Sequence, residues 1–120
     1  MGNALSTSLI LNGVLDCGFL VPAIRRRATG AWFRSLREAD GRARRVHDAF
    51  LGWCFAFHGI ARLSAGIEPE NASLRRIAVF SYFFEMASFG SQVMNGNLEL
   101  RAVAPTIVIP AAMLLLLLGR

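Results

Sequence analysis

Four apolar stretches make up most of this 120-residue chain, and each is close to the length of a membrane-spanning helix. A helix needs about 20 mainly apolar residues to cross a bilayer. The four stretches are residues 5–24, 49–67, 77–94 and 103–118. The longest polar interval, residues 25–48, is too short to form a separate soluble domain. We therefore expect one domain over residues 1–120, an all-α integral membrane four-helix bundle.

The interval 25–48, which we interpret as a loop, is rich in arginine. All 13 basic residues of the chain are arginine, and eight of them lie between Arg25 and Arg45. Basic loops stay on the cytoplasmic or matrix side of a membrane, so both termini and the 68–76 turn are expected on the opposite face. The net charge of +5 then reflects this topology and contact with anionic phospholipids. Nucleic acid is not an expected partner, because the basic segment is short and membrane spans flank it.

Aromatic and basic residues are interleaved in this loop, as in Trp32, Phe33 and Arg34. This pattern fits a short interfacial helix with its rings toward the membrane and its arginines toward the headgroups. A solvated basic loop is the alternative. The residues expected to contact lipid headgroups are Arg25, Arg26, Arg27, Trp32, Arg34 and Arg37.

Four ionisable residues lie inside the apolar stretches: Asp16, His58, Arg62 and Glu85. With a rise of about 1.5 Å per residue, His58 and Glu85 lie at matching depths, roughly 13 and 12 Å from the turn between their stretches. Asp16 comes out at roughly 16 Å from the same side. Arg62 is nearer the interface, and its long side chain can reach either the headgroups or Glu85. We expect one polar cluster within the membrane.

This cluster has two interpretations. Ionisable groups are costly in hydrocarbon and often mark a pathway, which suggests a proton or substrate site. Alternatively, the same side chains hydrogen-bond between helices and pin the packing, or contact a partner subunit. We favour the pin, because no metal-ligand spacing, nucleophile motif or glycine-rich phosphate loop accompanies them. No catalytic, metal-binding or cofactor-binding residue is assigned, and we do not expect an enzyme. Cys17 and Cys54 are interpreted as packed thiols.

The second half of the chain carries a recognisable set of short motifs. Gly52-Trp53 and GIARLSAGI (59–67) precede a turn with Asn71 and Leu74, then SFGSQ (88–92), then the Ala-Pro of VAPTIVIP (103–110). Over residues 50–118 the chain thereby resembles the ergosterol biosynthetic protein 28 family, small four-span proteins of the endoplasmic reticulum.

Individual positions extend this resemblance and also limit it. Arg62 falls where the family has an arginine that ends its second span, and Phe89 and Ser91 match the family's His-Phe-x-Ser-Glu motif. Ser88 and Gln92 replace the histidine and glutamate of that motif. Both ionisable members of the motif are therefore missing from this chain.

The resemblance implies a non-catalytic scaffold that holds sterol C-4 demethylation enzymes together, with other membrane subunits as partners. An accessory subunit of a mitochondrial inner-membrane respiratory or ATP synthase complex is an alternative, favoured by the lysine-free, arginine-rich composition. A small proton-coupled transporter is a third hypothesis, with Asp16 as the carboxylate of its first span. The long interval after Ile24 argues against it, because such transporters have short loops.

The predicted orientation can be tested by cysteine accessibility. In a chain with Cys17 and Cys54 replaced, Ser35→Cys should react with an impermeant reagent added from the cytosolic or matrix side, because the arginines around it are retained there. Ser73→Cys, in the opposite turn, is the control and should react only from the other side. Labelling of Ser35→Cys from the lumenal or intermembrane side alone would reject this topology.

Overall fold

The computed structural model describes residues 3–26 and 41–119, with side chains for residues 3–25 and 46–119. Over these residues the chain is entirely α-helical apart from short turns, which confirms the predicted all-α class. The helices are α1 (Asn3–Arg26), α3 (Gly41–Ile67), α4 (Ala72–Met94), α5 (Leu100–Val103) and α6 (Pro105–Leu118). Four are main helices, and α5 is a single turn that precedes α6.

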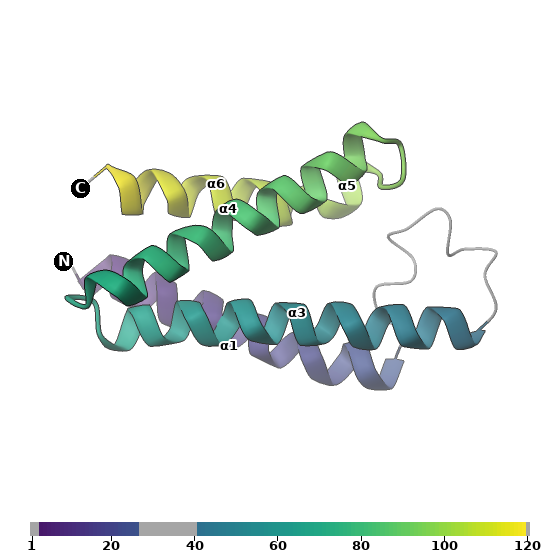
Figure 1. The fold of residues 1–120 in the computed structure, drawn as a ribbon, viewed down its shortest axis with the longest axis horizontal. Coiled ribbons are helices and arrows are strands. Elements are labelled where there is room, and N and C mark those ends of the chain that lie inside the picture. The colour runs from purple at the N-terminus through teal and green to yellow at the C-terminus, as the bar shows by residue number, and fades with distance from the viewer. Residues whose placement is uncertain (1–2, 27–40, 120) are drawn as a thin grey trace.

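The main helices form two antiparallel pairs that lie against each other (Figure 1). Helix α1 packs along α3, and α4 packs against both α6 and α3. Both termini lie at the end where α3 turns into α4 (Figure 1). Asn71 begins α4 as its N-cap, and its side-chain oxygen accepts hydrogen bonds from the backbone amides of Ser73 and Leu74. This cap satisfies amides that a helix start leaves unpaired, so the chain reverses direction within a few residues.

Two helices in the described part of the chain are long and apolar enough to cross a membrane, Asn3–Arg25 and Val46–Ile67. They extend for roughly 35 and 33 Å, against a hydrocarbon thickness of about 30 Å. In the most apolar 18-residue segment of each helix, only 22% and 39%, respectively, is buried inside the protein. A core helix of a soluble protein is mostly covered, so the apolar surface here faces outward.

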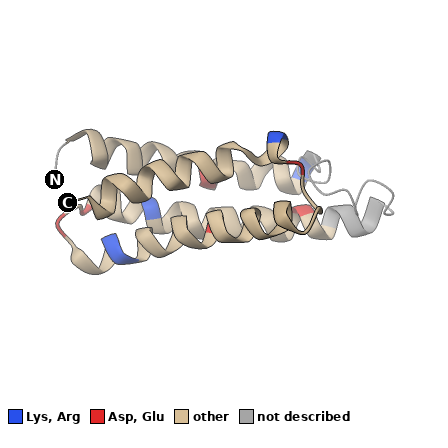
Figure 2. Cartoon of the chain, turned by 90° about the horizontal axis from the view of Figure 1, so that it is seen from above, with Lys and Arg blue, Asp and Glu red and all other residues tan. Residues whose placement is uncertain are grey.

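The other two main helices are less suited to crossing by themselves. Helix α4 carries Arg75, Arg76 and Glu85. Helix α6 is strongly apolar, but its 14 residues extend only about 21 Å. Charged residues are nevertheless sparse along the middle of all four helices, as Figure 2 shows.

Helix bounds in the structure differ from the predicted stretches, and α4 already begins at Ala72, within the predicted 68–76 turn. The predicted loop 25–48 is too long, because α1 continues to Arg26 and α3 begins at Gly41. Arginine and alanine favour helix, so the helices extend beyond the apolar residues that defined the stretches. Asp48, placed in the loop from sequence, is a fully buried residue of α3. The predicted interfacial helix, with Arg27, Trp32, Arg34 and Arg37, lies outside the described residues.

The fourth stretch, predicted as one span over 103–118, is interrupted near its start. Helix α5 ends at Val103 and α6 starts at Pro105. Proline lacks a backbone N–H and fits the first position of a helix, so a break falls before it. The Thr106 hydroxyl donates a hydrogen bond to the Val103 carbonyl at 2.6 Å and joins the two segments.

The core consists of two apolar clusters with a polar layer between them. One cluster lies toward the termini and contains Leu5, Leu9, Ala65, Ala78, Tyr82, Met113 and Leu114. The other lies toward the far end and contains Phe55, Phe89, Leu98 and Val103. Asp16, Arg62 and Glu85 lie between these clusters in sequence on their helices and are all buried. The polar layer is therefore closed off along the helix axes by apolar packing.

Helices α1 and α3 approach so closely that glycine is required at their crossing. A Cβ atom on Gly13 would lie 2.7 Å from both the carbonyl oxygen of Gly59 and the backbone nitrogen of Leu63. A Cβ on Gly59 would lie 2.6 Å from the carbonyl oxygen of Gly13. Small residues allow this kind of approach in membrane helix pairs. Since the obstructing atoms are backbone, a larger residue must push the helices apart.

Alanine substitution at Gly13 should therefore destabilise the protein, by about 1–3 kcal/mol for an overpacked contact. Gly18 provides the matched control on the same helix, because a Cβ there meets nothing within 4 Å. Gly18→Ala should be neutral or stabilising by up to about 1 kcal/mol, since alanine is the better helix former. The measurement is the thermal midpoint of purified protein in mild detergent. Equal midpoints for the two variants would contradict the close approach.

Candidate functional site

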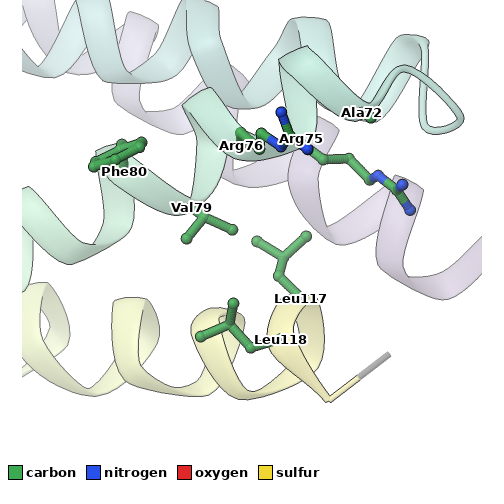
Figure 3. Close-up of a pocket in the computed structure, with 7 residues that line it drawn as sticks. All are labelled: Ala72, Arg75, Arg76, Val79, Phe80, Leu117 and Leu118. Atoms are coloured by element: carbon green, nitrogen blue, oxygen red, sulfur yellow. The ribbon is translucent and has the colours of Figure 1, made fainter.

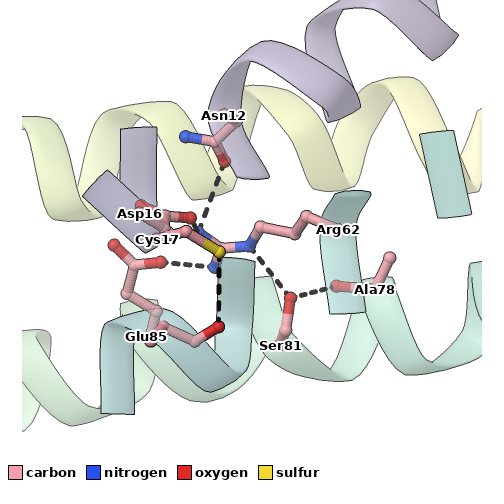
Figure 4. A network of polar contacts seen from close by, with 8 residues as sticks. Asn12, Asp16, Cys17, Arg62, Ala78, Ser81 and Glu85 are labelled. Atoms are coloured by element: carbon pink, nitrogen blue, oxygen red, sulfur yellow. Dashed lines mark hydrogen bonds and ion pairs between the residues drawn. The ribbon is translucent and has the colours of Figure 1, made fainter. Parts of the chain in front are cut away.

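Arg62 of α3 lies at the centre of the polar layer and is only 1% exposed. Its Nη1 donates to Asp16 Oδ2 at 2.5 Å and to Asn12 Oδ1 at 3.3 Å, both on α1. Its Nη2 donates to Glu85 Oε2 of α4. Its Nε donates to Ser81 Oγ, also on α4, at 3.0 Å. All three guanidinium nitrogens are thus paired within the chain, and α3 is tied to both neighbours (Figure 4).

Two residues of α4 complete the surroundings of the guanidinium. The Ser81 hydroxyl donates its proton to the Ala78 carbonyl at 2.8 Å, which leaves its oxygen free to accept from Arg62. The Tyr82 ring lies under the guanidinium, with Arg62 Cζ 3.9 Å from the ring centroid. A cation over an aromatic face is attracted by the ring quadrupole, by up to about 2 kcal/mol when water is excluded. Arg62 is therefore covered as well as hydrogen-bonded.

The energetic role of this network follows from burial. A charge removed from water carries a desolvation cost that only well-placed partners offset. Removing one partner of a buried pair typically costs about 3–5 kcal/mol, because the other charge is left uncompensated. Arg62 has partners on α1 and α4. Any packing that separated either helix from α3 would leave a charge unpaired.

The network also contains more carboxyl groups than guanidinium groups. Asp16 and Glu85 together contribute two carboxylates against the single guanidinium of Arg62. Both carboxylates line a cavity of about 310 Å³ between the helices. The other residues that line this cavity are Asn12, Leu15, Phe19, Phe55, Arg62, Pro105, Thr106, Ile109 and Pro110.

His58, the fourth residue of the expected cluster, does not join the network. Its ring contacts Phe57 and Phe84 edge-on, at centroid distances of 6.3 and 5.9 Å. It makes no hydrogen bond to the side chains described here, and it shares with Glu85 a separate cavity of about 180 Å³. A turn of helix separates it from Arg62, and its short side chain does not reach the carboxylates that the long arginine reaches.

Three residues of the network, Asn12, Ser81 and Tyr82, were not part of the cluster expected from sequence. Ser81 and Tyr82 precede Glu85 by four and three residues, a spacing that places side chains on the same helix face. That spacing was the available signal, although serine and tyrosine are ordinary in apolar helices. Among the residues expected at headgroups, Arg25 is exposed near the end of α1. The side chains of Arg26, Arg27, Trp32, Arg34 and Arg37 lie outside the described set.

A third cavity, of about 360 Å³, lies between α4 and the end of α6 (Figure 3). Val79, Leu117 and Leu118 form its apolar walls, and Arg75 and Arg76 line it in the first turns of α4. None of these residues takes part in the Arg62 network. Basic heads beside apolar walls are typical of side chains at a membrane surface, where the stems stay in the apolar region.

Comparison with models of known protein families, with curated proteins and with solved structures found no match for this chain. In the described part of the chain, no group of three or more His, Cys, Asp or Glu side chains is arranged to hold a metal ion. Function is therefore inferred from the Arg62 network and from the outer surface of the helices.

Replacement of Arg62 by leucine should destabilise the protein by about 3–5 kcal/mol, because Asp16 and Glu85 lose their shared partner. Glu85→Gln should be mild, since Arg62 keeps Asp16. Combining Arg62→Leu with Glu85→Gln should recover part of the loss, and adding Asp16→Asn should recover more. Thermal midpoint and yield of monodisperse protein report these differences.

Arg76→Leu is the control for loss of an arginine, because Arg76 is exposed on α4 and outside the network. It should change the midpoint little, as expected for an exposed charge. If Arg62→Leu behaved like Arg76→Leu, or if the combined variants recovered nothing, the ion pairs would not hold the helices together.

Proposed function

We propose that this protein is a non-catalytic membrane scaffold or accessory subunit that holds a larger membrane enzyme complex together. The observation that supports it best is the complete pairing of the Arg62 guanidinium inside the chain. The buried Arg62 guanidinium thereby fixes the packing of α3 against α1 and α4. A rigid small bundle with an apolar exterior is suited to present surfaces to other membrane proteins.

The outer surface supports a position within a membrane. Large apolar side chains are exposed on every main helix, among them Leu15 on α1, Phe57 on α3, Phe80 on α4 and Leu115 on α6. Soluble monomers rarely expose contiguous apolar surface on this scale. In a bilayer the same side chains contact lipid or partner helices. We accordingly propose that all four main helices lie within the membrane, with α5 and α6 together forming the fourth span.

Aromatic side chains concentrate on one side of this surface, along a groove of about 520 Å³ between α3 and α4. The groove is lined by Phe50, Trp53, Cys54, Phe57, His58, Ala61, Ile77, Phe80, Ser81 and Phe84. Aromatic residues are enriched among the anchors of protein interfaces. We propose that a transmembrane helix of a partner subunit packs in this groove.

The resemblance to the ergosterol biosynthetic protein 28 family favours sterol C-4 demethylation enzymes of the endoplasmic reticulum as partners. Arg62, which matches the arginine of that family, is the centre of the network. The motif positions Ser88 and Gln92, which depart from the family, lie outside the network. Anionic phospholipids are proposed as further contacts of the arginine-rich segment, for the electrostatic reason given above.

A pulldown in mild detergent followed by mass spectrometry tests this proposal. Sterol dehydrogenases and oxidases among the captured proteins would support the sterol scaffold, and respiratory or ATP synthase subunits would support the mitochondrial alternative. Recovery of the chain alone, or as a dimer of itself, would argue against a scaffold.

Neighbouring phenylalanines provide a matched pair of variants for the same experiment. Phe84 lines the groove, whereas Phe83 is exposed outside it. Phe84→Ala should weaken partner capture by roughly 30-fold, because truncating a hot-spot residue costs roughly 2 kcal/mol and about 1.4 kcal/mol is tenfold in affinity. Phe83→Ala should capture partners like the parent chain. Equal capture by the two variants would place the partner elsewhere.

A further inference from the structure

The cavity beside the Arg62 network has two chemically different sides. Asp16 and Glu85 contribute carboxylates, and Thr106 contributes a hydroxyl oxygen. Phe19 and Phe55, which also line the cavity, contribute apolar aromatic rings. The centroids of these rings are 5.0 Å apart, and the ring planes are inclined at 60°. Acidic residues and aromatic residues thus line the same space.

The carboxylates keep unused capacity toward this space. Glu85 is only 6% exposed, and Arg62 takes up its Oε2 alone. Among the described residues, no hydrogen bond is made by Glu85 Oε1 or by Asp16 Oδ1. Figure 4 shows the second oxygen of Glu85 turned away from Arg62. With both carboxyl groups ionised, one negative charge would remain after Arg62 is counted, on groups that line the cavity.

We propose that this cavity binds an organic ammonium ion with small apolar substituents. The surplus carboxylate charge neutralises the ammonium, and the Phe19 and Phe55 rings attract it through cation–π interactions. The volume of about 310 Å³ is at the lower end of the range for small-molecule sites, which is roughly 300–1,000 Å³. The remaining apolar walls, from Leu15, Ile109 and Pro110, suit the substituents.

Two other cations fit the lining less well. A hard metal ion such as Ca²⁺ takes about 6–8 oxygen ligands, more than this largely apolar cavity offers. A proton on one carboxylate would neutralise the surplus but would leave the aromatic space unfilled. The combination of rings with carboxylates is what favours an ammonium ion.

The test uses the purified full chain in detergent and two probes of the same shape. Benzyltrimethylammonium is the cation, and neopentylbenzene is its neutral analogue, with carbon in place of nitrogen. Isothermal titration should show saturable binding of the ammonium with an affinity at least tenfold above that of the neutral analogue. Equal binding of both probes, or no binding of the ammonium, would overturn the proposal, the latter leaving a proton as the counter-charge.

Variants separate this site from adventitious partitioning. Glu85→Gln removes the surplus charge while Arg62 keeps Asp16, so the protein should remain folded and lose ammonium affinity at least tenfold. Asp16→Asn should behave in the same way. Glu68→Gln is the control, because Glu68 is an exposed residue of the α3–α4 turn and should leave binding unchanged. Unchanged binding in a folded Glu85→Gln protein would overturn the assignment. The result does not depend on the scaffold role, which the pulldown tests separately.

Discussion

The ion pairs of Arg62 with Asp16 and Glu85 are the interaction on which the helix arrangement depends. A guanidinium with almost no exposure must have its hydrogen bonds and its charge satisfied by neighbours, because neither water nor hydrocarbon does so there. The partners come from one helix before α3 and one after it. Apolar packing alone tolerates sliding and rotation between helices, whereas these directed bonds specify depth and facing for α1, α3 and α4 together.

The backbone packing around this layer serves the same arrangement. Gly13 and Gly59 bring α1 and α3 into contact near Asp16, so that the short aspartate side chain reaches the guanidinium. Helix α4 joins through Ser81, Tyr82 and Glu85 on a single face. Apolar clusters on both sides keep the layer enclosed. The ion-paired centre thus determines how the helices pack against one another, and the apolar exterior contacts the surroundings.

Part of the site was predicted from the sequence. The residues that were predicted wrongly or missed show which information the sequence lacks. Asp16, Arg62 and Glu85 stand out because ionisable residues are rare in apolar stretches, and their depths along the helices predicted a cluster. His58 met the same criteria, yet it lies among aromatic rings beside Phe57 and Phe84. The depth of a residue along a helix follows from counting residues. Which neighbours a short side chain points toward depends on how the helices cross. Ser81 and Tyr82 were missed because both are ordinary residues in an apolar helix. Only their contacts with Arg62 in the folded chain identify them as part of the network.

The sequence by itself determined the helical class and the apolar stretches. The cap at Asn71 and the break before Pro105 also follow from local sequence, although the stretch 103–118 was predicted to be unbroken. These features depend on local chemistry: hydrophobic runs, side-chain hydrogen bonds to nearby amides, and the missing N–H of proline. The tertiary structure alone decided which helices pair, which carboxylates Arg62 meets, and that a cavity with aromatic and acidic walls opens beside them. Such contacts join residues as far as 60 positions apart, as in the hydrogen bond from Ser6 of α1 to the Gly66 carbonyl of α3. Their energies depend on burial and mutual orientation, which the order of residues along the chain does not contain.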